Sequence, residues 1–350
     1  MAKKKSSPKR SNSGNKMRVG IDLGTSRSAI SASNGAREWV ASYVGWPKDF
    51  ISEKVLGKPV LFGKEALDNR LSLELVRPLE HGVIKEGISR DEEAVQELVR
   101  HMLELVGALE SQEIYAVVGV PAESLRANKL AIKRAVQDYV DSLMVVSEPF
   151  AAAYGRGLLN NAIVIDIGAG TTDFCIMHGA MPTEDDQRTI VTAGDYIDQQ
   201  LYNMLKDKYP ESDFNMNMVR NYKEAHSYVG TVKGKVEVEI PVSGRMMLHD
   251  ITEEMGRACE SVLPAIIENA MELIAKFDPE YQEIVRENIV LAGGGSQIRG
   301  LAKYIETALS EDGPTKVSVV DDPVYASADG ALALAQDMPE EYWEDLLKDE

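Results

Sequence analysis

The sequence is poor in the residues and segments that define secreted, metal-cluster and membrane-spanning proteins. It has only two cysteines among 350 residues, Cys175 and Cys259, each in an apolar context, so we expect buried free thiols of a cytosolic protein rather than a disulfide. The five histidines are scattered, and no His/Cys cluster has the spacing of metal ligands. No apolar run approaches the roughly 20 residues of a membrane span, and the N-terminal residues lack the apolar core of a secretory signal. We therefore expect a cytoplasmic protein without a transmembrane segment.

Positive charge is also scarce, with 38 Lys and Arg residues against 56 Asp and Glu residues and a net charge of −18. This imbalance disfavours non-specific binding of nucleic acid. Residues 1–16 are the exception, because they carry six basic residues and no acid, which leaves −24 for the rest of the chain. Since Ser, Asn, Gly and Pro separate the charges, we expect residues 1–16 to form a disordered basic tail. Such a tail is either a dispensable extension or a weak electrostatic tether to neighbouring protomers, anionic lipid, or acidic organelle or adaptor proteins.

The most informative stretch is Ile163-Val-Ile-Asp-Ile-Gly-Ala-Gly-Thr-Thr-Asp173. Its β-forming residues predict a buried strand up to Asp166, and residues 174–177 predict a returning strand. Gly168 and Gly170 permit a tight turn and close approach of a ligand to the backbone. By itself such a hairpin is more often an ordinary turn. Its amide N–H groups would nevertheless suit a phosphate, and the carboxylate would suit a hydrated Mg²⁺.

A second copy of this pattern strengthens the functional interpretation. Residues 17–32 combine an apolar strand with Asp22, Gly24, hydroxyl side chains and a returning strand. The two aspartates lie about half the chain apart, which predicts a duplicated fold with a phosphate between its halves. A third glycine site, Gly293-Gly-Gly295, follows the strand predicted over 287–292 and is typical of a place where a flat or anionic group lies on the backbone.

Other polar residues have two interpretations each. Glu148 lies where a strand ends and a helix begins, so it is either a helix-dipole carboxylate or a group that orients or deprotonates water. Asp195 is either the N-cap of the helix predicted over 196–209 or an acceptor for ribose hydroxyls. Lys223 and Glu224 are neighbouring opposite charges, which usually mark a solvated helix face.

Strands alternate with helices along the chain, which predicts an α/β protein, and the 44% hydrophobic fraction is sufficient for a large core. We expect a turn over 42–47 and one long helix over 251–277 with an irregularity at Pro264. The small residues of 322–335 predict a helix that approaches its neighbours closely, and 339–350 predict a short amphipathic helix.

Together these motifs resemble the actin/Hsp70/sugar-kinase ATPase fold. The likeness rests on the two Asp-Gly-hydroxyl hairpins, the strand–Gly-Gly-Gly–helix at 289–300 and the helices that begin at Pro121 and Asp322. It covers nearly all of 17–347 and is most similar to the bacterial actins that organise magnetosome chains. Ser147–Tyr154 resembles bacterial actins in general, and Lys223–Val229 resembles the actin segment that contacts the adenosine. The segments that carry the narrower likeness are Gly45–Asp49, Leu56–Pro59, Arg77–Val83, Asp278–Gln282 and Glu341–Trp343.

The resemblance implies an actin-like ATPase fold of two similar halves, each with an RNase H-like core, around a nucleotide cleft. The first half would span 17–162 (subdomain IA), with a smaller insertion, IB, at about 48–90. The second would span 163–320 (subdomain IIA), with an insertion, IIB, at about 196–258. Residues 321–350 would form helices that return to the first half.

The resemblance also implies ATP or ADP with Mg²⁺ as ligands. Asp22 and Asp166 would hold the hydrated Mg²⁺, Glu148 would position the attacking water, and Glu148 and Asp166 would be the catalytic pair. The residues assigned to the nucleotide are Gly24, Thr25, Ser26, Gly168, Ala169, Gly170 and Thr171 at the phosphates, Gly194 and Asp195 at the ribose, Lys223 and Glu224 at the adenosine, and Gly293, Gly294 and Gly295 beneath the nucleotide. The tip of the first hairpin has no lysine, so charge neutralisation there would rest on amides and metal.

The implied function is a cytoplasmic, cytoskeletal, filament-forming ATPase that hydrolyses ATP slowly, polymerises with itself and organises magnetosomes. A plasmid-partitioning or cell-shape bacterial actin is the nearest alternative. A small-molecule kinase of the same superfold would need a substrate pocket built from larger insertions. A chaperone-type ATPase would need a substrate domain after the ATPase, and a scaffold without hydrolysis would not need the Asp22, Glu148 and Asp166 set.

Overall fold

The computed structural model describes residues 16–80, 83–84, 89–122 and 125–345. The predicted basic tail therefore lies outside the described residues, apart from Lys16. That residue is the first of strand β1 (Lys16–Leu23), so the strand begins one residue before the expected boundary. Its ammonium pairs with Glu340 at 3.1 Å and lies 3.6 Å from the centre of the Tyr115 ring, which ties the start of the first sheet to the C-terminal segment.

The first half is built on a six-stranded sheet with the order β18-β10-β9-β1-β2-β3. A meander of β1, β2 and β3 is antiparallel, whereas β9 runs parallel to β1 and β10 runs parallel to β9. The bounds of the other strands are β2 (Arg27–Ala32), β3 (Arg37–Ala41), β9 (Glu113–Val120), β10 (Ser142–Ser147) and β18 (Glu344–Asp345).

The second half repeats this topology. Its five-stranded sheet has the order β13-β12-β11-β16-β17, with the same pattern of strand directions as β3-β2-β1-β9-β10. The strands are β11 (Asn160–Ile167), β12 (Thr172–His178), β13 (Gln187–Ile190), β16 (Ile289–Ala292) and β17 (Val317–Val319). The duplication predicted from the two hairpins is confirmed.

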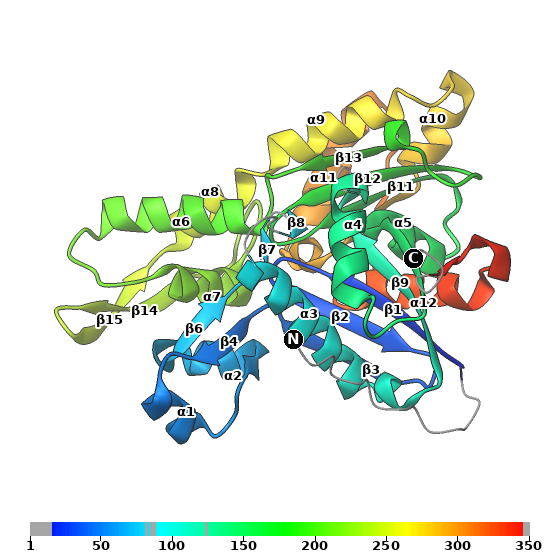
Figure 1. Cartoon of the computed structure of the whole chain (residues 1–350). Helices are drawn as coiled ribbons and strands as arrows, with labels where there is room; N and C mark the ends of the chain where they lie inside the picture. The colour runs from blue at the N-terminus through cyan, green and yellow to red at the C-terminus, as the bar shows by residue number, and fades with distance from the viewer. Residues whose placement is uncertain (1–15, 81–82, 85–88, 123–124, 346–350) are drawn as a thin grey trace, which may run out of the picture.

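Two helices, α5 (Glu148–Gly155) and α12 (Ala326–Asp337), lie between the sheets and share a buried apolar layer with both halves (Figure 1). Glycines let them approach closely. A Cβ on Gly20 of β1 would lie 2.1 Å from the carbonyl oxygen of Ala328, and one on Gly330 would lie 1.8 Å from that of Ala151. Close packing of the small-residue helix is therefore confirmed, and α12 contacts β1, β2 and β9 of the first half.

Five further helices cover the outer faces of the two sheets. Those of the first half are α3 (Ser89–Leu105) and α4 (Leu125–Val136), and those of the second half are α9 (Leu263–Ile274), α10 (Pro279–Arg286) and α11 (Leu301–Leu309). Each half has its own apolar core beneath these helices. Cys175 and Cys259 are buried free thiols, as predicted. Among the described residues, no helix combines the length and apolar character needed to cross a membrane.

Each half carries an inserted subdomain, and the two insertions lie next to each other at the left of Figure 1. Subdomain IB contains α1 (Phe50–Leu56), α2 (Gly63–Asp68) and a sheet of β5 (Leu61–Phe62), β4 (Val44–Pro47) and β6 (Leu73–Val76). The pair β7 (Leu79–Glu80) and β8 (Val83–Ile84) follows it. Subdomain IIB contains α6 (Gly194–Lys208), α7 (Met216–His226), β14 (Glu237–Val242), β15 (Arg245–Asp250) and α8 (Thr252–Glu260).

Three expectations about local structure are wrong. The turn predicted over 42–47 is largely strand β4, so the IB insertion starts before residue 48. The long helix predicted over 251–277 is two helices, α8 and α9, and Pro264 lies in the first turn of α9, where its missing N–H breaks no helical bond. Of the amphipathic helix predicted over 339–350, the described part up to residue 345 forms a 3₁₀ turn and then β18, which pairs with β10, and residues 346–350 lie outside the described residues.

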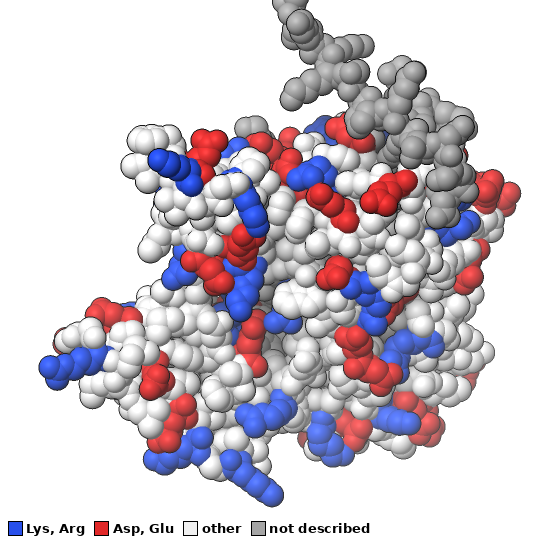
Figure 2. Space-filling model, turned by 90° about the horizontal axis from the view of Figure 1, so that it is seen from below, with Lys and Arg blue, Asp and Glu red and all other residues white. Residues whose placement is uncertain are grey.

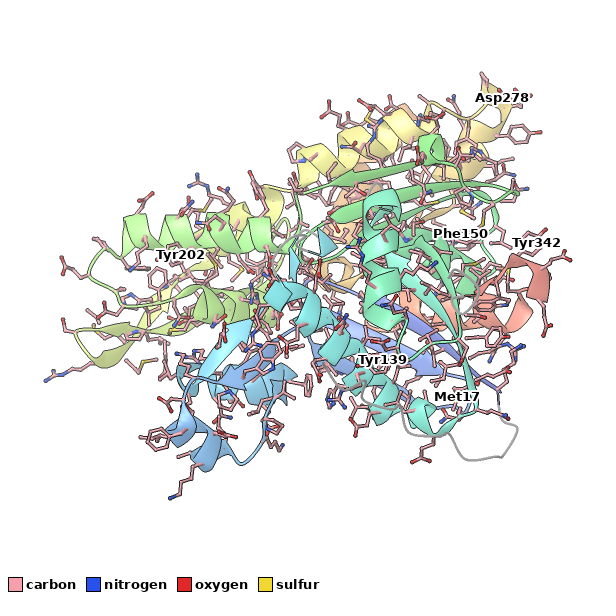
Figure 3. The ribbon with its side chains drawn as sticks, viewed as in Figure 1. Met17, Tyr139, Phe150, Tyr202, Asp278 and Tyr342 are labelled. Atoms are coloured by element: carbon pink, nitrogen blue, oxygen red, sulfur yellow. The ribbon has the colours of Figure 1, made fainter. Side chains whose placement is uncertain are left out.

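One face of the molecule mixes both signs of charge. On the face shown in Figure 2, Lys and Arg side chains alternate with Asp and Glu. In Figure 3, Tyr342 of the 3₁₀ turn lies on the side of the molecule remote from Tyr202 of IIB, with Phe150 of α5 between them. The inserted subdomains and the C-terminal segment therefore mark opposite ends of the molecule.

Candidate functional site

A cleft between the two halves holds every residue that the sequence assigned to a site. Its cavity volume is about 300 Å³, and both sheets contribute strand ends to its wall. The predicted residues that line it are Asp22, Gly24, Thr25, Ser26, Glu148, Asp166, Gly168, Ala169, Gly170, Thr171, Gly194, Asp195, Lys223, Glu224, Gly293, Gly294 and Gly295. The fold thus brings three glycine segments, far apart in sequence, to one place.

The tip of the second hairpin is fixed by backbone hydrogen bonds. Within the tip, the Gly168 amide donates to the carbonyl of Thr171 at 2.9 Å. From the start of α6, the amides of Gly194 and Asp195 donate to the carbonyls of Gly168 (3.1 Å) and Ala169 (2.7 Å). The hairpin is therefore held against the first turn of α6.

The tip of the first hairpin is fixed mostly by side chains. The Ser42 hydroxyl donates to the carbonyl of Gly24 at 2.6 Å, and the Ser42 amide donates to the carbonyl of Ser26 at 2.9 Å. Arg77 Nε donates to the carbonyl of Thr25 at 2.8 Å. Ser42 precedes β4 and Arg77 follows β6, so both ends of subdomain IB hold this tip.

The three glycines after β16 have different surroundings. Gly293 has φ +72°, and a Cβ there would lie 2.3 Å from Asp166 Oδ1. A Cβ on Gly295 would lie 2.3 Å from Cγ2 of Ile167. At Gly294 a Cβ would meet no atom within 4 Å, although this residue lines the cleft. Gly293 and Gly295 are thus needed for packing, whereas Gly294 faces open space. Gly294 and Gly295 begin a 3₁₀ turn, and the helix of the predicted strand–Gly-Gly-Gly–helix motif begins after it, at Leu301.

Four carboxylates converge at the floor of the cleft. Burial, and next the charges of Asp22, Asp173 and Asp166, raise the pKa of Glu148 well above its usual range. Burial and then Asp166 and Asp173 do the same for the pKa of Asp22. Burial and the Asp173 charge raise the pKa of Asp166 to about 7, against the opposing effect of the Ser327 hydroxyl, which donates to its Oδ2 at 3.2 Å. Mutual repulsion of this kind makes the cluster complementary to a cation.

This donor set suits a hydrated divalent ion better than a directly caged one. No group of three or more His, Cys, Asp or Glu residues is placed to ligate a metal within the described ranges. Mg²⁺ usually keeps several waters and takes one or two protein carboxylates in addition to substrate phosphates. Oε1 of Glu148 is buried without a hydrogen-bond partner among the described residues, as expected of a group that meets water or ligand in the cleft. Glycine backbone and carboxylates together therefore fit a magnesium–phosphate ligand.

The charged residues assigned to ribose and adenosine, Asp195, Lys223 and Glu224, form ion pairs. Lys223 Nζ lies 2.8 Å from Asp198 Oδ1 and donates to the carbonyl of Gly194 at 2.8 Å, and its side chain is only 13% exposed. The solvated-face interpretation is therefore wrong for Lys223. Glu224, which is more exposed, pairs with Arg27 of the opposite half at 3.3 Å. The N-cap interpretation of Asp195 is also wrong, because Ala193 is the N-cap residue of α6.

Several residues of the site were not predicted as such. Asp173 is buried, and its Oδ1 accepts from the Ala122 amide (2.8 Å) and the Thr189 hydroxyl (2.5 Å). Asp198 is buried in the first turns of α6, and Ser327 bonds Asp166 from α12. The second hairpin motif contains Asp173, so its carboxylate was visible in the sequence. Nothing local marks Asp198 or Ser327, because their partners come from distant elements. Further unpredicted lining residues are Arg27, Pro121, Ile167, Ile197, Arg220, Ser227, Gln297, Ile298, Pro323 and Val324.

Comparison with known proteins places the chain among bacterial actins. It matches the family described as MreB/Mbl protein over residues 16–342. It is 42% identical to the actin-like protein MamK of Paramagnetospirillum magneticum, over 95% of this chain and 96% of that protein. It is also 42% identical to the actin-like protein MamK of Magnetospirillum gryphiswaldense, over 94% and 91% of the two chains.

Solved structures agree with this placement. A MamK double helical filament matches with a TM-score of 0.90 at 42% identity, over 93% of this chain and all (100%) of that one. A non-polymerising MamK mutant bound to AMPPNP matches with a TM-score of 0.72 at 41% identity, over 93% and 100% of the two chains. The actin-like fold and the resemblance seen in the sequence are confirmed. The chain belongs to the MreB/Mbl family and groups within it with the actin-like MamK proteins.

Proposed function

We propose that this chain is a filament-forming, actin-like ATPase that binds Mg-ATP in the cleft and hydrolyses it slowly, with hydrolysis coupled to polymerisation. The observation that carries the proposal is the convergence of both glycine hairpins, the Gly293–Gly295 segment and Glu148 on one cleft between duplicated halves. Relatives that are described as filaments and as an AMPPNP complex support it.

In this proposal the tips of the two hairpins hold the phosphates through backbone amides. Asp22 and Asp166 would hold a hydrated Mg²⁺, which when bound would neutralise charge on the transferred phosphoryl group. Gly294 leaves room for the nucleotide, Asp195 accepts from the ribose, and Lys223 and Glu224 contact the adenosine. The residues of the cleft fit a magnesium nucleotide, because the glycine backbone suits the phosphates, the carboxylates suit the metal, and the open space at Gly294 suits the nucleotide.

Glu148 is the residue proposed to orient the attacking water. It lies at the end of β10 in the first turn of α5, within the acidic floor of the cleft, and its Oε1 is available for a hydrogen bond to water. A carboxylate in that position orients the attacking water towards the terminal phosphate and accepts its proton. Within the described residues, the two arginines that line the cleft, Arg27 and Arg220, pair with carboxylates. Without an additional cation for the transition state, turnover is expected to be slow.

Self-association is the proposed partner interaction. The relatives described as filaments support a homopolymer of this chain. Its position in the bacterial cytoplasm along the magnetosome chain is a further part of the proposal, which rests on the resemblance to the actin-like MamK proteins. A plasmid-partitioning or cell-shape role remains the alternative within the same family. The basic residues of 1–16 are proposed as a weak tether to anionic lipid or to acidic organelle or adaptor proteins.

The proposal is tested with purified full-length protein. Phosphate release and sedimentable polymer are both expected with ATP and Mg²⁺, and both should fall when EDTA removes the metal. Phosphoryl transfer to a sugar or to acetate, without polymer, would instead support a small-molecule kinase. Polymer without any nucleotide dependence would contradict the coupling.

A further inference from the structure

Arg77 joins the two halves of the molecule at the nucleotide cleft. It follows β6 of subdomain IB and precedes Pro78, which favours extended backbone at Arg77. Its Nε donates to the carbonyl of Thr25 in the first hairpin at 2.8 Å. Its Nη1 and Nη2 lie 2.9 and 3.2 Å from Oδ2 and Oδ1 of Asp195, in the second half. One guanidinium therefore contacts a phosphate hairpin and the proposed ribose carboxylate at once.

Asp195 is held by this fork and by a second arginine. Arg220 Nη2 lies 3.4 Å from Asp195 Oδ1, and Arg220 Nε lies 3.3 Å from the buried Asp198. A carboxylate has about four acceptor positions, of which these three arginine contacts use most. The clamped carboxylate therefore has a fixed plane and acceptor capacity left for a ribose hydroxyl. A free Asp195 would have to be ordered by the nucleotide itself, at a cost in affinity.

Two other contacts cross the cleft beside Arg77. Arg27 pairs with Glu224, and Arg220 Nη1 donates to the Tyr43 hydroxyl at 2.9 Å. All three contacts bring the IB side of the first half to the IIB side of the second, where the insertions lie next to each other in Figure 1.

We propose that Arg77 is a positioning residue that aligns Asp195 for the ribose and thereby links nucleotide recognition to closure of the two halves. This inference rests on the proposed function. Arg77 does not itself line the cavity, so it acts through Asp195 and the Thr25 carbonyl. Lysine cannot replace it, because an ammonium lacks the planar fork that contacts both carboxylate oxygens.

Ribose discrimination is the property that a merely structural arginine would not control. The experiment compares binding of ATP and of 2′,3′-dideoxy-ATP, each with Mg²⁺, by titration calorimetry of the full chain below its polymerisation concentration. Wild-type protein is expected to prefer ATP by roughly tenfold or more, because a site built to bond a hydroxyl rejects the analogue that lacks it. Arg77→Ala and Arg77→Lys are expected to weaken ATP binding and to reduce the preference to less than about threefold.

Arg90→Ala is the matched control. Arg90 belongs to the first half and pairs with Glu74 and Glu93, which lie in the same half, so its loss should leave the preference unchanged. Thermal unfolding of each variant shows that it is folded. If both Arg77 variants prefer ATP over 2′,3′-dideoxy-ATP as strongly as the wild-type protein does, the inference is overturned and the proposed function is left intact. Wild-type protein that fails to bind ATP would overturn both.

Discussion

The two halves share one sheet topology but differ at the strand ends that face the cleft. After β9 the first half has Pro121, and after β10 it has Glu148. At the corresponding ends of β16 and β17, the second half has the Gly293–Gly295 segment and Pro323. The two halves therefore have the same sheet topology, but equivalent strand ends carry different residues and have different proposed roles. The first half provides the carboxylate proposed to orient water, and the second provides a surface without side chains for the nucleotide.

The hairpins differ in a similar way. Two of the three bonds that hold the tip of the first hairpin come from the side chains of Ser42 and Arg77, which flank an inserted subdomain, whereas the second tip is held by backbone amides at the start of α6. Side-chain bracing can be removed by substitution and backbone bracing cannot. The first hairpin is thus the more adjustable of the two, and subdomain IB can influence the phosphate site through it.

The largest expected effect is on chemistry and belongs to the first half. Glu148→Ala should slow phosphate release by about 10²–10⁴-fold, because a positioned acid–base group contributes on that scale. Nucleotide binding and assembly should persist, so stable filaments are expected in sedimentation assays. The matched change at the equivalent strand end, Asp322→Ala, should leave the rate near that of wild type. A Glu148→Ala protein that releases phosphate at the wild-type rate would show that Glu148 of the first half does not orient the attacking water.

The second effect is a pH dependence of stability from Asp166. Its pKa is raised from 3.8 to about 7, so the folded protein binds this proton more tightly than the unfolded chain does. The side chain therefore costs stability progressively as the pH rises from about 4 to about 7, and each unit of pKa shift corresponds to about 1.4 kcal/mol.

Asp166→Asn removes that cost. In metal-free, nucleotide-free protein, the melting temperature of the variant relative to wild type should increase between pH 5 and pH 8. A difference that is constant or shrinks with pH would contradict the described electrostatics of the acidic floor. Loss of Mg-dependent ATPase activity in the same variant is expected from its proposed role.

The third effect is a loss of stability at Gly293, the glycine that the packing of the second half requires. Gly293→Ala should lower stability by roughly 1–3 kcal/mol from backbone strain alone, because its φ is +72°. The added Cβ would also press on Asp166 Oδ1. Chemical denaturation measures the loss. A fully stable Gly293→Ala protein would contradict the backbone described at this strand end.

The smallest effect comes from the neighbouring residue. Gly294→Ala places a methyl group in open space, so the free energy of unfolding should stay close to wild type, while ATP affinity should fall about tenfold, which is 1.4 kcal/mol. Calorimetric titration measures the ATP affinity, and denaturation of the same sample measures the free energy of unfolding. Unchanged affinity would mean that the nucleotide does not lie over Gly294.

Local patterns in the sequence predicted the two hairpins, the duplication and all the lining glycines, because short glycine turns between strands are visible within about ten residues. Pairings over long separations were not predictable. Arg77 and Asp195 are 118 residues apart, and Ser327 and Asp166 are 161 apart. Strand β4 was missed because Gly45 and Pro47 suggest a turn, and its neighbours in the sheet supply its stability.

The proposed roles of the two halves at the cleft are tested most directly by electron cryo-microscopy of the protein polymerised with AMPPNP and Mg²⁺. We predict filaments in which triphosphate density lies between the tips of the two hairpins, the nucleoside lies over Gly294, and Glu148 faces the terminal phosphate. Filaments with no nucleotide in the cleft, or with the phosphates away from either hairpin, would contradict the account.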